Sequence, residues 1–170
     1  LESSKAPVFP ATVSWKQRVS QWVCRREINQ LLKAKALPAP SANVYQLVII
    51  PIAKELPAIL SLGLNSLSRQ TFPTKRMMVV LALEAWAPSQ VREGAKGLRK
   101  QYQAAFYDVL LVEHPQGLPG EARVKGANVT FAAKAAARLL ESRAIAPEHV
   151  IVSCFDADTV VGEDYMSYLT

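Results

Sequence analysis

Long apolar runs, cysteine motifs and glycine-rich phosphate loops are all missing from this sequence of 170 residues. No apolar run approaches the roughly 18 residues that suggest a membrane-spanning helix, and no secretory signal pattern opens the chain. No GxGxxG segment follows the first predicted strand and no GxxxxGKS/T segment occurs anywhere. These absences exclude the dinucleotide fingerprint and the P-loop.

Cysteine is scarce, with only Cys24 and Cys154 in the chain. Two cysteines do not make a disulfide framework, and no CxxC or Cys/His spacing indicates zinc. A reducing compartment is therefore favoured over an oxidising one. Because Cys154 lies inside an apolar run, we expect it to be a buried core residue.

The positive charge of the chain is concentrated at its N-terminus. Residues 1–43 contain seven basic and two acidic side chains, whereas the remaining 127 residues contain 13 basic and 12 acidic ones. Nucleic-acid binding needs a sustained basic surface, so the nearly neutral body of the chain argues against nucleic acid as its main partner.

Residues 1–43 are predicted to be a basic amphipathic segment and linker that precedes a domain over residues 44–170. Prolines bracket residues 14–35, which are predicted to form a helix with Trp15, Val19 and Trp22 on one face. Two interpretations stay open: the helix contacts a membrane surface, or it packs on the domain with its charges solvated. Since the chain begins with Leu1, we expect it to come from a longer protein.

From Val44 onward, apolar runs alternate with helical patterns. Strands rich in Val, Ile and Leu are predicted over 46–52, 76–84, 106–113 and 150–155. Helices are predicted over 55–68, 88–104 and 127–141, and another begins at Glu163. The alternation predicts an α/β fold with a doubly wound, mostly parallel, Rossmann-like sheet. Ligands of such sheets bind outside the carboxyl ends of the strands.

Acidic side chains follow two of the predicted strands. Asp156 and Asp158 come directly after the fourth strand, where paired carboxylates suit Mg²⁺ or Mn²⁺ shared with phosphates. The alternative is an Asp-rich turn before the next helix. Glu84 ends the second strand, where a carboxylate can accept hydrogen bonds from a base or ribose, although a solvated strand-end charge is the alternative.

A positive site is predicted where the alanine-rich helix begins. Lys125 supplies a charge, and the helix start supplies unpaired N–H groups and a positive dipole end, which suits a diphosphate. The alternative is a plain helix start with Asn128 in its first turn. We expect Asp156 and Asp158 at the end of a central strand, with Lys125 on the same side of the sheet.

The order of these features resembles family 2 glycosyltransferases of the GT-A fold. A strand ending in Ile-Pro with Glu55 soon after, an acid at the second strand end, Lys-Gly-x-Asn before an alanine-rich helix, and Asp-Ala-Asp after a later strand occur there in this order. The resemblance covers Val44 to about Thr170 and corresponds to the first half of that catalytic domain, so we expect an incomplete domain.

The resemblance implies transfer of a sugar from a nucleoside-diphosphate sugar, first of all a UDP-sugar, to a glycan or lipid acceptor, with inversion. It implies Mn²⁺ or Mg²⁺ held by Asp156 and Asp158. It also places the longer protein on the cytoplasmic side, in many members as an integral membrane protein. The nucleotide-sugar contacts that it implies are Pro51, Ile52, Glu55, Glu84, Lys125, Asn128 and Asp156.

The sequence departs from the family at several positions. Ala53 and Lys54 stand where an aromatic residue and Asn are common, and Glu84 stands where Asp is more frequent. The carboxylate that deprotonates the acceptor and the Gln-x-x-Arg-Trp segment are not visible, and we expect them beyond Thr170. The catalytic base therefore stays unassigned, and this stretch is expected to bind donor without transferring sugar.

Two other functions compete with this interpretation. Phe155 to Val161 resembles the Asp-x-Asp-x-Thr motif of haloacid-dehalogenase phosphatases, in which the first Asp attacks phosphorus and the second acts as acid and base. That motif normally ends the first strand, whereas here it ends the fourth. A non-catalytic protein that binds partners through its sheet is the other alternative, because fold does not fix function.

Overall fold

The structure, a computed structural model, describes residues 22, 25–26, 29–30, 33, 40–118 and 124–170. The chain divides into two compact units, Leu1–Pro38 and Ala39–Thr170. In the first unit the described residues have helical backbone, and the Arg26 guanidinium lies 5.7 Å from the centroid of the Trp22 ring. Most of the predicted 14–35 helix lies outside the described residues, so its membrane interpretation stays a prediction.

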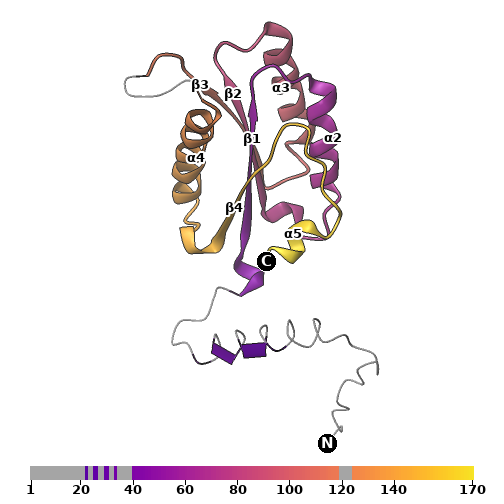
Figure 1. Cartoon of the computed structure of the whole chain (residues 1–170), viewed down its shortest axis with the longest axis vertical. Helices are drawn as coiled ribbons and strands as arrows, with labels where there is room; N and C mark the ends of the chain where they lie inside the picture. Colours follow the sequence, from indigo (N-terminus) through magenta and orange to yellow (C-terminus); the bar gives the residue numbers. More distant parts are fainter. Residues whose placement is uncertain (1–21, 23–24, 27–28, 31–32, 34–39, 119–123) are drawn as a thin grey trace, which may run out of the picture. The chain divides into compact units, whose positions relative to one another are not determined.

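The second unit is built on one parallel sheet (Figure 1). Its strands are β1 (Tyr45–Ile52), β2 (Met77–Glu84), β3 (Asp108–His114) and β4 (Val150–Cys154), in the order β3-β2-β1-β4. All three neighbouring pairs are parallel. This sheet confirms the α/β fold that the sequence predicts.

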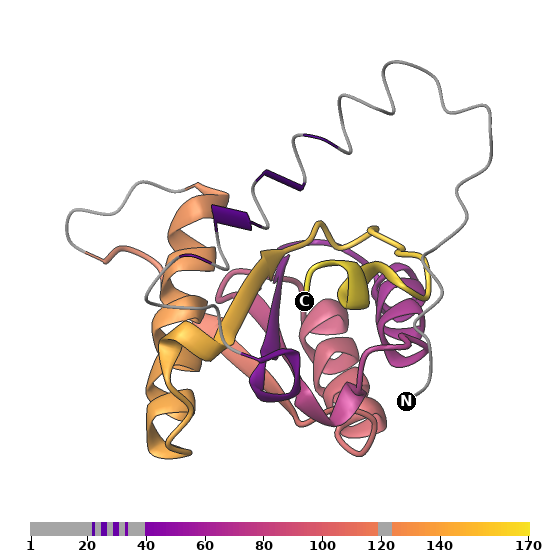
Figure 2. The same cartoon turned by 90° about the horizontal axis from the view of Figure 1, so that it is seen from below.

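Helices cover both faces of the sheet. They are α2 (Pro57–Ser68), α3 (Ser89–Tyr102), α4 (Lys125–Ser142) and the short α5 (Tyr165–Tyr168), with 3₁₀ turns η1 (Ser41–Asn43), η2 (Thr74–Arg76) and η3 (Pro147–His149). In both views α4 lies on one face, and α2 and α3 lie on the other (Figures 1 and 2). No helix in the described part of the chain is both long and apolar enough to cross a membrane.

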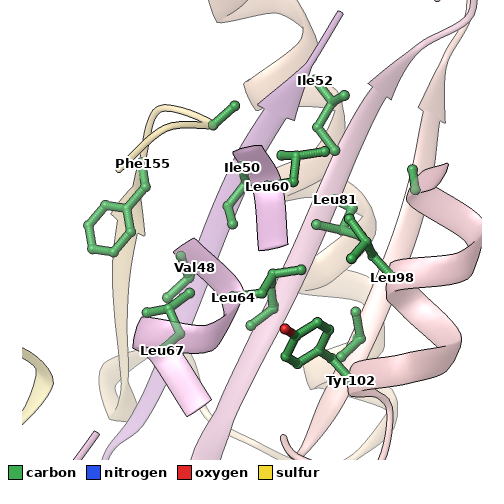
Figure 3. Close-up of a cluster of buried hydrophobic side chains, with 14 of the residues drawn as sticks. Val48, Ile50, Ile52, Leu60, Leu64, Leu67, Leu81, Leu98, Tyr102 and Phe155 are labelled. Atoms are coloured by element: carbon green, nitrogen blue, oxygen red, sulfur yellow. The ribbon is translucent and has the colours of Figure 1, made fainter. Parts of the chain in front are cut away.

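Alternation along the strands divides the core into two layers, because successive strand side chains point to opposite faces. Val48, Ile50 and Ile52 of β1 pack toward α2 and α3, as Figure 3 shows. Leu47 and Ile49, their sequence neighbours, pack toward α4. The α4 side of this second layer is made by small and apolar residues, among them Ala132, Ala136 and Leu140. Burial on both faces explains why β1 and β2 are continuously apolar.

Strand β4 departs from the prediction, because it is an edge strand in the described sheet. Cys154 is exposed and is therefore not a core residue, and Val152 is 58% exposed. Their register partners Leu47 and Ile49 lie under α4, but α4 packs mainly on β1, β2 and β3. Because α4 leaves this face of β4 uncovered at Val152 and Cys154, these two side chains are exposed. The acids that follow β4 consequently lie at the sheet edge, not on a central strand.

The residues after β4 cross to the side of the sheet that α2 covers. Gln70, which follows α2, is buried and makes two side-chain hydrogen bonds to these residues. Its Nε2 donates to the Gly162 carbonyl at 2.7 Å, and its Oε1 accepts from the Met166 N–H at 2.9 Å. Met166 is fully buried. These contacts anchor the far end of the loop that begins at Asp156.

Candidate functional site

A cavity of about 900 Å³ lies at the carboxyl edge of the sheet. It is lined from all four strand ends, by Ile52 of β1, Glu84 of β2, His114 of β3 and Asp156 after β4. Parallel strands bring their carboxyl ends to one edge, which is where open α/β sheets bind ligands.

The residues singled out from the sequence meet in this cavity. Its lining includes Pro51, Ile52, Glu55, Glu84, Lys125, Asn128, Asp156 and Asp158. The fold thus brings together positions from the ends of three strands, β1, β2 and β4, and from the start of α4. Among the lining residues that sequence reasoning missed are His114 and Trp86. The strand-end rule could have found His114, which is the last residue of β3.

The turn after β1 is organised by Glu55. Its Oε2 accepts hydrogen bonds from the N–H of Ala53 at 2.6 Å and of Lys54 at 2.9 Å. Burial, the largest single influence, raises the pKa of the Glu55 carboxyl. The backbone N–H groups of residues 53–55 and the Lys54 charge together outweigh it, so this pKa lies below its ordinary value of 4.5. Glu55 thus holds the cavity wall in shape as a carboxylate.

Glu84 and His114 form a pair at the ends of β2 and β3, where they are register partners. His114 Nδ1 lies 3.2 Å from Glu84 Oε2, and the side chains are only 9% and 15% exposed. Because a carboxylate can only accept, the imidazole is the donor. The ring also lies 5.2 Å from that of Phe131 on α4. The pair orients one carboxylate oxygen of Glu84, and the other can accept a hydrogen bond from a ligand N–H or O–H.

Lys125 and Asp156 form an ion pair across the cavity, between the start of α4 and the end of β4. Both side chains are more than half exposed, so the pair contributes little to stability. A ligand can therefore replace either partner at small cost. The pair confirms that Lys125 lies on the same side of the sheet as the acids.

Asn128 ties α4 to β2. Its Nδ2 donates to the Ala82 carbonyl at 2.8 Å, and the residue is only 2% exposed. Its Oδ1 is buried and has no hydrogen-bond partner in the described part of the chain. The amide fixes the first turn of α4, and with it the unpaired N–H groups that point out of the helix start.

The two carboxylates that follow β4 are the candidates for holding a metal ion. Asp156 and Asp158 both line the cavity and are both exposed. Within the described ranges no group of three or more His, Cys, Asp or Glu side chains could hold a metal. Mg²⁺ is usually held by one or two carboxylates plus phosphate oxygens and water. The two acids therefore suit an ion that arrives with a phosphate ligand.

No family model matches the sequence, and no curated protein matches it significantly. Solved structures do. TarS of S. aureus is 17% identical over 74% of this chain and 19% of its own, with a TM-score of 0.51. The structure of TarS 1-349 in complex with UDP gives 17% identity, coverages of 74% and 31%, and a TM-score of 0.52.

A third match is the mannosyltransferase PcManGT from Pyrobaculum calidifontis in complex with GDP-Man and Mn²⁺. It is 19% identical over 84% of this chain and 36% of its own, with a TM-score of 0.45. The chain thus spans between 19% and 36% of the length of these structures. At such identities the likeness to the two TarS structures concerns the fold alone: the chain has the α/β parallel-sheet architecture of part of those structures, as the resemblance to the GT-A fold predicts.

Proposed function

We propose that this chain is the donor-binding part of a glycosyltransferase that moves a sugar from a nucleoside-diphosphate sugar to a glycan or lipid acceptor. One observation carries the proposal: Glu84, Lys125 and the acids Asp156 and Asp158 line a single cavity at the carboxyl edge of a GT-A-like sheet. The fold shared with TarS, whose structure contains UDP, supports it.

The strand order gives the cavity two ends. Glu84 and His114 end β2 and β3 on one side of β1, while Asp156 follows β4 on the other side. Neighbouring strands are about 4.8 Å apart, so the ends of β2 and β4 are separated by roughly 10 Å. An elongated ligand is needed to contact both ends. A nucleoside at Glu84 with its diphosphate near Lys125 and Asp156 has the required length and charge.

The end of the cavity at Lys125 and the start of α4 favours a negatively charged ligand. Lys125 offers an ammonium group, and the 18-residue helix α4 offers its N-terminal N–H groups and positive dipole end. Asp156 and Asp158 would hold Mn²⁺ or Mg²⁺ there. When bound, such an ion supplies a Lewis acid that neutralises the charge developing on the departing diphosphate. Lys125, released from Asp156 by the incoming ligand, stabilises the same charge.

Titration calorimetry with UDP and Mn²⁺ or Mg²⁺ tests the proposal. Wild-type chain should bind UDP more tightly with the metal than without it, and Asp158→Ala should lose at least tenfold of that metal-dependent gain. Glu163→Ala is the matched control, because Glu163 is an exposed acid of the same loop that does not line the cavity. Unchanged metal dependence in Asp158→Ala would remove Asp158 from the metal role.

The competing functions give different results in the same preparation. A phosphatase should hydrolyse a simple phosphomonoester in a reaction abolished by Asp156→Asn. A binding scaffold should show no affinity for UDP with or without metal. Metal-dependent UDP binding without phosphomonoester hydrolysis separates the glycosyltransferase proposal from both.

A further inference from the structure

Trp86 is a large apolar side chain that the fold leaves in solvent. It follows Glu84 by two residues, lines the cavity and is 53% exposed. Tryptophan is highly buried on average in folded proteins. Among the described residues that line the cavity, Trp86 is the only Trp, Tyr or Phe. An exposed ring at the mouth of a charged cavity is a candidate contact for a flat ligand.

The backbone that carries Trp86 is fixed on both sides. The Ala85 N–H donates to the His114 carbonyl at 3.0 Å, and the Ala87 N–H donates to the Glu84 carbonyl at 3.0 Å. The Arg92 guanidinium donates to the Ala85 carbonyl at 3.2 Å. The ring therefore projects from a held turn, and little conformational entropy is lost when a ligand covers it.

The surroundings of Trp86 fit one class of ligand. Glu84, which is paired with His114, precedes Trp86 by two residues and supplies a carboxylate acceptor to the same cavity. Ile59 adds a partly exposed apolar side chain to the lining. A nucleobase combines a π-face with N–H donors on its edge. Ile52 is fully buried and Ala53 is small, so the turn after β1 offers no comparable flat surface.

We propose that Trp86 stacks on the base of the nucleotide while Glu84 accepts a hydrogen bond from the edge of that base. The inference rests on the proposed function and adds to it the residue that provides most of the base affinity. Every base has a π-face, so stacking tolerates all bases. Selection among bases then falls to the Glu84 carboxylate, which needs an N–H opposite it.

Three variants test the inference. Trp86→Ala should weaken UDP binding by roughly 5- to 150-fold, the range for loss of one base–aromatic stack. Trp86→Phe should keep most of the affinity because it retains an aromatic face. Trp22→Phe, at a tryptophan of the other unit that is 62% exposed, should change nothing. Binding of pyrophosphate with Mg²⁺ should be the same in all four proteins, since pyrophosphate has no base.

Tryptophan fluorescence gives a second readout. UDP with Mg²⁺ should quench emission in wild type and in Trp22→Phe, and the quench should disappear in Trp86→Phe although calorimetry still shows binding. Equal UDP affinity in Trp86→Ala and wild type would overturn the stacking inference and leave donor binding intact. An equal loss for UDP and pyrophosphate would also overturn it, because the ring would then act only on the fold. Failure of wild type to bind any nucleoside diphosphate would overturn both proposals.

Discussion

Replacing Glu55 with glutamine should weaken the turn after β1 by removing its charge while keeping its shape. Glu55 Oε2 accepts two backbone hydrogen bonds, at 2.6 Å and 2.9 Å. A hydrogen bond to a charged acceptor contributes about 1 kcal/mol more than one to a neutral acceptor. Two bonds give about 2 kcal/mol, and partial exposure of the carboxylate reduces this to roughly 1 kcal/mol. The melting temperature should fall by about 4 °C.

The effect of Glu55→Gln should depend on pH. Because the pKa of Glu55 is lowered in the folded state, its charge stabilises the fold above the unfolded-state pKa. That stabilisation is lost as the pH falls through the folded-state pKa, which lies below 4.5. The free-energy difference between wild type and variant should therefore be full at pH 7 and smaller at pH 3.

Urea denaturation at pH 7 and pH 3 measures this difference. Glu148→Gln is the control, because Glu148 is an exposed acid in η3, ahead of β4. The control should shift the urea midpoint little at either pH. If Glu55→Gln and wild type have the same free energy of unfolding at pH 7, the carboxylate charge does not stabilise the turn. The same conclusion follows if the difference between them is as large at pH 3 as at pH 7.

Other substitutions test the packing and the charge of the site. Gly94→Ala would place a Cβ 1.9 Å from Pro57 Cγ and should cost roughly 1–3 kcal/mol in thermal denaturation. Gly97→Ala in the same helix meets nothing within 4 Å and should stabilise by up to about 1 kcal/mol. Ala144→Gly relieves a φ of 56° after α4 and should increase the free energy of unfolding by about 0.5 kcal/mol, which is measured in urea denaturation. Lys125→Met should weaken UDP binding about tenfold in calorimetry at low salt, and less at high salt.

The elements of the sheet could be predicted because their patterns are strong. The buried strand β1 is apolar along almost its whole length. The helix predicted from residue 55 begins two residues later, at Pro57, because proline at a first helical position loses no hydrogen bond. Predicted boundaries lie within two residues of those observed. Because open α/β sheets bind ligands at the carboxyl ends of their strands, the position of the cavity followed from the predicted strands alone.

What could not be predicted depends on contacts between distant segments. The sequence of β4 is as apolar as that of a central strand, and only the reach of α4 shows that Cys154 is exposed. The predicted third strand stopped at Glu113, one residue before His114, so the partner of Glu84 was missed. The exposure of Trp86 depends on how the turn after β2 is held, which no local pattern reveals.

The pairing of β4 with β1 has a consequence for synthesis on the ribosome. The segment from β1 to β3, which carries Glu84, Trp86 and His114, is complete well before Val150–Cys154 is made. At ~5–20 residues per second, the roughly 36 residues from His114 to Val150 take about 2–7 s. During that interval the nascent chain already holds the aromatic and imidazole groups, while the edge of β1 has no neighbour and can pair with other chains. Asp156 and Asp158 are made after the other cavity residues discussed above, and the pairing of β4 that brings them to the cavity also covers this edge of β1.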